Sequence, residues 1–92
     1  MKHCKMAYSQ KLNKILVYSF KFSDLITKVK EGDFASRIYR THKGHWFILR
    51  KQKGHKAVFI PYEKACIIRL LLEHDRMKVI LKYFPNIEIG RA

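Results

Sequence analysis

The fold of this chain is decided by residues 37–60, RIYRTHKGHWFILRKQKGHKAVFI. Three runs rich in β-branched and aromatic residues are separated there by Lys43-Gly44 and Lys53-Gly54, each a candidate for a tight hairpin turn. The pattern predicts a three-stranded antiparallel meander. Two-residue loops are the simplest interpretation, but lysine at positive φ is disfavoured, so a bulged loop that shifts the register is the alternative.

Two-residue loops would place Ile38 opposite Leu49 and Leu49 opposite Val58. An aliphatic face would then carry Ile38, Arg40, Phe47, Leu49, Val58 and Ile60. An aromatic face would carry Arg37, Tyr39, Thr41, Trp46, Ile48, Arg50, Ala57 and Phe59. Aromatic rings interleaved with arginine on a sheet suit single-stranded nucleic acids, because bases stack on rings and phosphates need cations. The alternative for Tyr39, Trp46 and Phe59 is that these rings form core.

The segments around the meander predict one more strand and two helices. Residues 14–22, KILVYSFKF, read as a strand, and Ser23 with Asp24 reads as the cap of a short helix over residues 24–31 that ends at Gly32. Pro61 would open a helix over residues 62–74, which is apolar nearly all round. Residues 77–84 fit either a strand or a continuation of that helix. We therefore predict an α+β fold: an antiparallel meander sheet of about four strands packed by a C-terminal apolar helix, with a short helix after the first strand.

Ninety-two residues, 48% of them hydrophobic, predict a single domain over residues 14–92, preceded by a basic arm over residues 1–13. A domain of this size buries little surface, so we expect a homodimer to complete its core. The apolar helix supplies the candidate dimer interface, which consists of Cys66, Ile67, Leu70 and Leu71.

The strongest compositional signal is charge. Twenty Lys and Arg residues against seven Asp and Glu give a formal net charge of +13, which favours a polyanionic partner. Residues 34–62 contain no acid and seven of the positive charges, so the meander is the predicted electrostatic centre. An anionic membrane surface or an acidic protein would satisfy the same charge.

The remaining features indicate a soluble intracellular protein without a cofactor. Cys4 and Cys66 lie in different contexts and predict no disulfide framework. No hydrophobic signal segment follows the N-terminus, and no apolar run approaches the roughly 20 residues that a membrane span needs. His3-Cys4, His42 and His45 lack the spacing of a metal site, so we expect no metal ligands.

No motif of an enzyme is present, and we expect no catalysis. The acids are scattered, and neither a phosphate-binding glycine loop nor a nucleophile elbow occurs. A metal-dependent nuclease using Asp33 or the Glu73-His74-Asp75 cluster is the alternative, although a charged helix end explains that cluster more simply.

The run SRIYRTHKGHWFILRKQKGHKAVFIPYEKACIIRLLLEH leads basic, aromatic strands directly into a helix. In the order of their elements, residues 14–74 resemble one repeat of three folds that bind single-stranded nucleic acids: the Pur-alpha, Whirly and positive-cofactor-type folds. The helix predicted for residues 24–31 has no counterpart in those folds. The resemblance implies a curved sheet that presents aromatics and cations to single strands, while the helix packs on the sheet and against a second repeat or subunit. By this resemblance the contact set would be Arg37, Tyr39, Trp46, Arg50 and Phe59.

We therefore predict a non-catalytic protein that binds single-stranded DNA or RNA through the sheet and its basic turns. The predicted binding residues are Arg37, Tyr39, Arg40, Lys43, Trp46, Arg50, Lys51, Lys53, Lys56 and Phe59. The alternative is a structural or interaction protein, such as a ribosome-associated or viral accessory factor, that binds RNA or an acidic protein through bulk charge and an apolar helix.

Overall fold

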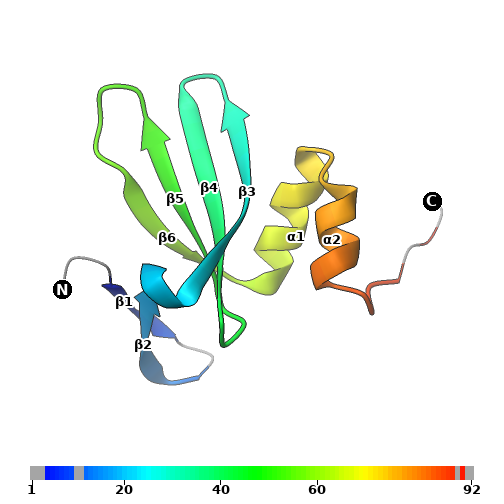
Figure 1. Ribbon diagram of the computed structural model, residues 1–92, viewed down its shortest axis with the longest axis horizontal. Coiled ribbons are helices and arrows are strands. Elements are labelled where there is room, and N and C mark those ends of the chain that lie inside the picture. Colours follow the sequence, from blue (N-terminus) through cyan, green and yellow to red (C-terminus); the bar gives the residue numbers. More distant parts are fainter. Residues whose placement is uncertain (1–3, 10–11, 89, 91–92) are drawn as a thin grey trace.

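The computed structural model describes residues 4–9, 12–88 and 90. Its elements are β1 (Cys4–Ser9), β2 (Lys14–Ser19), the 3-10 helix η1 (Phe20–Phe22), β3 (Ser23–Glu31), β4 (Phe34–Thr41), β5 (Trp46–Gln52), β6 (Val58–Tyr62), α1 (Lys64–Glu73) and α2 (Met77–Tyr83). Strands β3 to β6 form a four-stranded antiparallel meander, and β1 and β2 form a separate hairpin (Figure 1). The predicted α+β class, with a meander packed by a C-terminal helix, is confirmed, and the structure adds a second helix there.

The helix predicted for residues 24–31 is wrong, because this segment is β3. Val29 is buried while its neighbours Lys28 and Lys30 are exposed, which is the two-residue alternation of a half-buried strand. Gly32-Asp33 forms the two-residue turn into β4, and Gly32 has the positive φ of 55° that the first position of a type II′ turn requires. The segment thus supplies the fourth strand of the meander.

The N-terminal part also differs from its prediction. The strand predicted for residues 14–22 ends at Ser19, after which Phe20–Phe22 form η1. Within the predicted basic arm, Cys4–Ser9 form β1 and pair with β2 in an antiparallel hairpin.

The meander register is shifted by one residue at both predicted turns. Ile38 pairs with Ile48, and Ile48 pairs with Ile60. The predicted pairing of Ile38 with Leu49, and of Leu49 with Val58, is therefore wrong. A one-residue shift moves every side chain of a strand to the opposite face, so the predicted aliphatic and aromatic faces are each divided between the two sides of the sheet.

The turns give the physical reason for the shift. The Thr41 N–H donates to the His45 carbonyl at 2.7 Å, which closes a three-residue loop over 42–44 with Gly44 at φ 91°. A type I turn followed by glycine in the left-handed region is the usual three-residue hairpin. In the next connection the His55 N–H donates to the Gln52 carbonyl at 2.9 Å, and Gly54, at φ 83°, is the third residue of this turn, where a type II turn requires positive φ. The bulged alternative is the one that forms, because lysine stays at negative φ.

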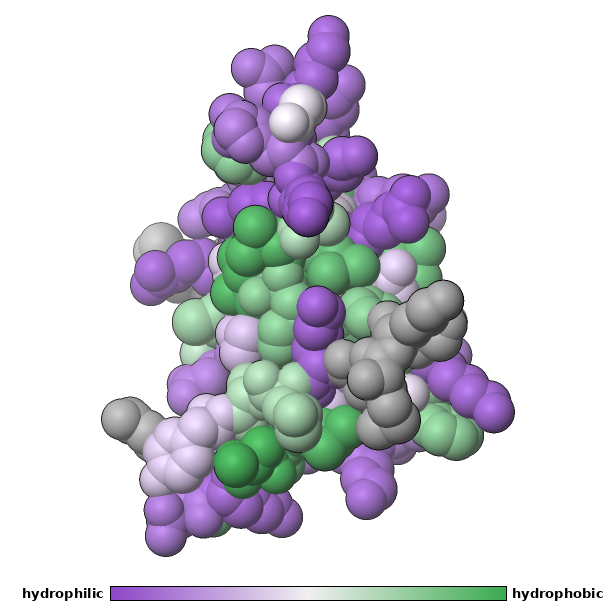
Figure 2. Space-filling view, turned by 90° about the vertical axis from the view of Figure 1, so that its left-hand side faces the viewer, coloured by the Kyte–Doolittle hydropathy of each residue, from purple (hydrophilic) through white to green (hydrophobic). Residues whose placement is uncertain are grey.

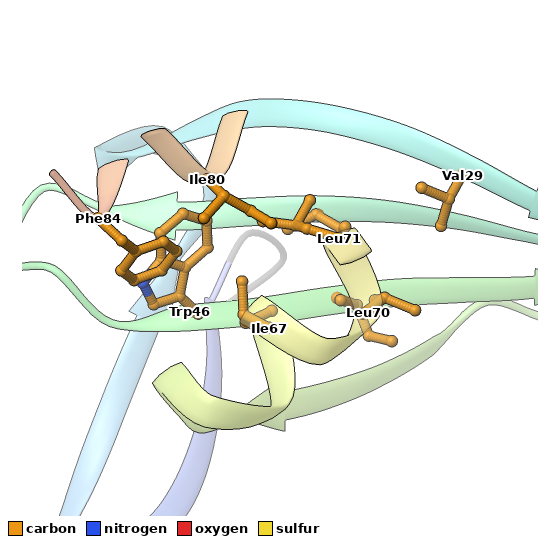
Figure 3. Packing of buried hydrophobic residues seen from close by; sticks show 9 residues of the cluster. Val29, Trp46, Ile67, Leu70, Leu71, Ile80 and Phe84 are labelled. Carbon is orange, nitrogen blue, oxygen red and sulfur yellow. The ribbon is translucent and has the colours of Figure 1, made fainter. Parts of the chain in front are cut away.

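The hydrophobic core lies between the helices and one face of the meander (Figure 3). The sheet contributes Val29, Ile38, Trp46 and Ile48, α1 contributes Ile67, Leu70 and Leu71, and α2 with the residue after it contributes Ile80 and Phe84. Every one of these side chains is less than 10% exposed. We call this the helix side of the sheet.

Local sequence features explain where the two C-terminal helices begin and end. α1 begins at Lys64, and Pro61 belongs to β6 instead of opening the helix, because an edge strand tolerates proline. The helix closes with Asp75 at φ 54°, and the Arg76 N–H donates to the Leu71 carbonyl at 2.8 Å, as in a Schellman motif. Residues 77–83 then form the separate helix α2. In the part of the chain that the structure describes, neither helix is long and apolar enough to span a bilayer.

The opposite face of the meander is partly covered by β2 and η1. The Tyr18 ring lies 5.2 Å from the Phe59 ring and 5.6 Å from the Phe47 ring, and the Phe20 ring lies 5.3 Å from the Phe47 ring. Tyr39 stacks on Phe47 with centroids 5.0 Å apart. This aromatic cluster occupies the end of the sheet next to the β1–β2 hairpin and leaves the other end open.

Candidate nucleic-acid interface

The open end of the sheet, on the side away from the helices, carries a group of exposed cations. In one row Lys28 of β3 pairs directly with Arg37 of β4, and in the next row Lys30 and Lys51 flank Ala35. All four cationic side chains are exposed, whereas the alternate residues Val29 and Ser36 are buried on the helix side. We call Lys28, Lys30, Arg37 and Lys51 the basic sheet face.

The β5–β6 connection, with Lys53 and Lys56, extends this positive surface beside the β3–β4 turn, which carries Asp33. The Lys53 N–H donates to the Asp33 carbonyl at 3.2 Å, which holds the β5–β6 connection against the β3–β4 turn. A groove of about 390 Å³ lies there, lined by Lys30, Gly32, Asp33, Ala35, Lys51 and Lys53. Figure 2 shows hydrophilic side chains gathered at the top of the molecule, where Figure 1 places both turns, above an apolar area.

No described carboxylate forms an ion pair with the charges of this face. Among the residues that the structure describes, the two ion pairs are His42 with Asp24 at 3.6 Å and His74 with Glu31 at 2.6 Å, and neither involves a lysine or an arginine. Like charges placed directly opposite on adjacent strands, such as Lys28 and Arg37, destabilise a sheet. An anion bound over this face would remove that repulsion.

Apolar side chains continue the row of cations across the sheet. Arg37 pairs with Leu49, and Leu49 pairs with Phe59, so the row reads Lys28, Arg37, Leu49, Phe59 from β3 to β6. Leu49 and Phe59 are partly exposed. Cations on one half of the face and an aromatic ring on the other match the phosphate and base components of a single strand.

The structure brings together part of the predicted binding set. Arg37 and Lys51 lie on the basic sheet face, and Lys53 and Lys56 lie in the exposed β5–β6 connection at the same end. Lys43 is also exposed, but it belongs to the β4–β5 turn at the opposite end of the sheet (Figure 1).

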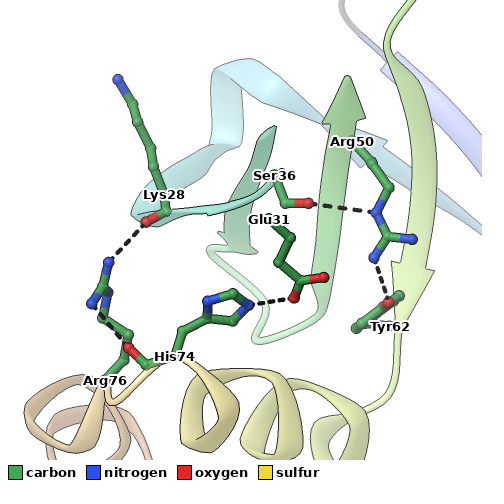
Figure 4. A network of polar contacts seen from close by, with 7 residues as sticks. All are labelled: Lys28, Glu31, Ser36, Arg50, Tyr62, His74 and Arg76. Carbon is green, nitrogen blue, oxygen red and sulfur yellow. Dashed lines mark hydrogen bonds and ion pairs between the residues drawn. The ribbon is translucent and has the colours of Figure 1, made fainter. Parts of the chain in front are cut away.

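Arg40 and Arg50 lie on the helix side and are not part of this face. The Arg40 guanidinium lies 6.0 Å from the Trp46 ring and 5.9 Å from the Tyr83 ring. The Arg50 guanidinium donates to the Ser36 hydroxyl at 3.5 Å and to the Tyr62 hydroxyl at 3.3 Å (Figure 4). The predicted grouping of Arg50 with Arg37 is wrong, because the register shift places them on opposite faces.

The predicted aromatic contacts are corrected in the same way. Trp46 is 4% exposed and packs against Phe84, with ring centroids 5.3 Å apart, so it is a core residue. Tyr39 and Phe59 do lie on the face away from the helices, but both belong to the aromatic cluster around Phe47. Both rings are partly exposed: Tyr39 follows Arg37 by two residues on the same face of β4, and Leu49 separates Phe59 from Arg37 in their common row.

The predicted dimer interface is also largely core. Ile67, Leu70 and Leu71 are buried against the sheet of their own chain, so these three side chains are not available to a second copy. The prediction failed because the apolar stripe of the helix is satisfied within the monomer. Cys66 lies on the exposed side of α1.

Lys28 and Lys30 are functional candidates that the sequence reasoning missed. Both lie in the segment for which the sequence predicts a helix, residues 24–31, although the alternation of Thr27 and Val29 with the two lysines, followed by Gly32-Asp33, indicates a strand and a hairpin turn. Figure 4 shows the Lys28 side chain pointing away from the helices, while its carbonyl accepts a hydrogen bond from Arg76 at 3.4 Å.

The described residues contain no cluster of three or more His, Cys, Asp or Glu side chains that could hold a metal ion. Of the His3-Cys4 pair considered above, His3 lies outside the described residues. Comparison of the chain with protein-family models, curated proteins and solved structures found no match.

Proposed function

We propose that this chain is a non-catalytic nucleic-acid-binding protein that holds single-stranded DNA or RNA on the basic sheet face. One observation carries the proposal: Lys28, Lys30, Arg37 and Lys51 are exposed on three adjacent strands beside Leu49 and Phe59, and no described carboxylate pairs with them. Phosphates would bind over β3 and β4, and bases would contact the apolar half over β5 and β6.

The order of elements supports the proposal by analogy. Four antiparallel strands, β3 to β6, lead into α1, and the helix packs on the face opposite the basic sheet face. The Pur-alpha, Whirly and positive-cofactor-type folds, which the sequence resembles in its order of elements, present the sheet to single strands in this way. Fold-level analogy is weaker support than the charges and the register.

The test is a salt titration of binding to a fluorescent oligothymidylate, comparing the wild type with the double variant Lys28→Gln/Arg37→Gln. Each lost phosphate contact lowers the slope of log K against log salt by about 0.7 for a single strand, so we expect a decrease of about 1.4. At low salt the affinity should fall by about tenfold or more.

The matched control is Arg69→Gln/Lys78→Gln, which removes the same charge from exposed positions on α1 and α2. This control should keep the wild-type slope. If both double variants lose the same affinity and slope, the charge acts in bulk and the basic sheet face is not the binding site. Equal affinity for duplex and single strands would also contradict the proposal.

A further inference from the structure

The β1–β2 hairpin presents an unpaired strand edge. In the described part of the chain the hairpin is a two-stranded sheet, so β2 pairs with β1 on one side and with no other described strand. On β2, Ile15 is 66% exposed and Val17 is 57% exposed. An apolar, unpaired edge strand is a template for another extended chain, because its outward N–H and C=O groups can continue the ladder.

A groove of about 740 Å³ runs along this edge. All six residues of β2 line it, together with Phe22 and the β4–β5 turn, whereas no described residue of β1 does so. Its position therefore corresponds to the edge of β2 that lies away from β1. Its volume is that of a ligand pocket.

The residues that line the groove indicate which kind of ligand it would bind. Ile15, Val17 and Phe22 form an apolar surface, Lys14 and Lys43 bring positive charge, and none of the described residues that line the groove is an acid. The His42 imidazole faces Asp24 at 3.6 Å, so the two lysines supply the unpaired charge. A second copy of this chain would bring its own Lys14 and a net charge of +13 to the same groove, which disfavours self-pairing.

We propose that β2 binds an extended segment of a partner protein, alternating in apolar and acidic residues, which adds to its open edge as a third strand. The backbone of the segment pairs with β2, its apolar side chains contact Ile15, Val17 and Phe22, and its carboxylates face Lys14 and Lys43. This site is separate from the basic sheet face and does not depend on nucleic-acid binding.

The probe is a fluorescein-labelled octapeptide of alternating valine and glutamate, titrated with the full chain and followed by fluorescence anisotropy. We expect saturable binding that weakens at least tenfold in Val17→Glu and in Lys43→Glu, the second of which leaves the hairpin strands intact. The matched control, Leu72→Glu, introduces the same charge at an exposed apolar position on α1 and should stay within twofold of the wild type.

Two further comparisons separate strand addition from simple charge attraction. The same peptide with every backbone amide methylated keeps its charge but cannot donate to the edge, and it should not bind. Lys28→Gln/Arg37→Gln should bind the peptide as the wild type does, whatever its effect on nucleic acid.

Equal binding of the methylated peptide, or unchanged binding by both Val17→Glu and Lys43→Glu, would overturn the proposal. So would the absence of any binding. A wild-type dimer in light scattering that becomes monomeric in Val17→Glu would overturn it as well, because a second copy would then occupy the edge.

Discussion

Lys28 and Arg37 lie directly opposite one another on β3 and β4, and both side chains are exposed. Opposed like charges on a sheet cost a few tenths of a kcal/mol to about 1 kcal/mol. We therefore expect Lys28→Gln to raise the free energy of unfolding by about 0.2–1 kcal/mol in urea denaturation at low salt. The gain should shrink at 1 M salt, where screening removes the repulsion. No gain over Lys78→Gln, a control at an exposed position on α2, would mean that this pair is not a source of repulsion.

A substitution of Trp46 tests whether the core lies on the helix side of the sheet. Because its ring is buried against Phe84 and Tyr83, Trp46→Ala should lower the free energy of unfolding by about 3–5 kcal/mol, a large part of the stability of a small domain. Thermal unfolding followed by circular dichroism measures this loss. Leu81→Ala, at an exposed position on α2, should change the stability by less than about 0.5 kcal/mol. A fully stable Trp46→Ala protein would be inconsistent with the helix side described above.

The burial of Tyr18 leads us to expect that the free energy of unfolding falls at alkaline pH. Desolvation by burial raises the pKa of Tyr18 above its ordinary value of 10.0, so the folded state favours the neutral phenol. The unfolded chain then loses the proton first, and this contribution to stability is present below pH 10 and declines as the pH rises toward the folded-state pKa. Urea titrations from pH 8 to pH 11 should show a steeper decline for the wild type than for Tyr18→Phe. Parallel curves would indicate that the phenol titrates alike in both states.

Asp75 has the conformation of a glycine. It closes α1 at φ 54°, where residues with a side chain are strained. Asp75→Gly should therefore raise the free energy of unfolding by about 0.5–1 kcal/mol. Gly54→Ala tests the opposite change, from glycine to a residue with a side chain at positive φ. The added methyl group would contact nothing within 4 Å, so the φ of 83° alone should lower the free energy of unfolding by about 1 kcal/mol. Chemical denaturation of both variants measures the two effects, and a destabilised Asp75→Gly protein would contradict the assignment.

The meander and the C-terminal helix could be predicted because their signals are local: Gly44 and Gly54 interrupt runs of β-branched and aromatic residues. The register could not be predicted, because the sequence around each glycine fits a loop of two residues as well as a loop of three. The loop length determines on which face of the sheet Trp46 and Arg50 lie. The segment over residues 24–31 was ambiguous because Leu25, Ile26 and Val29 fit a helical stripe as well as a strand. Its pairing with β4 is a tertiary contact that local propensity does not contain.

The packing of the apolar helix on its own sheet was predicted, but so was a dimer contact through the same side chains. An apolar stripe on a helix does not reveal whether its own sheet or a second copy covers it, and here the sheet does so. The basic sheet face was located only in part for a related reason, because Lys28 and Lys30 join Arg37 and Lys51 only when β3 pairs with β4.

Trp46 is the only tryptophan of the chain, and it lies on the side of the sheet opposite the basic face. Its intrinsic fluorescence therefore reports the docking of α1 and α2, while a ligand bound to the far side stays beyond contact with the indole. A spectroscopist can use this separation directly: emission that changes on adding an oligonucleotide would mean that the helices have shifted, and constant emission would mean that the scaffold holds still while it binds.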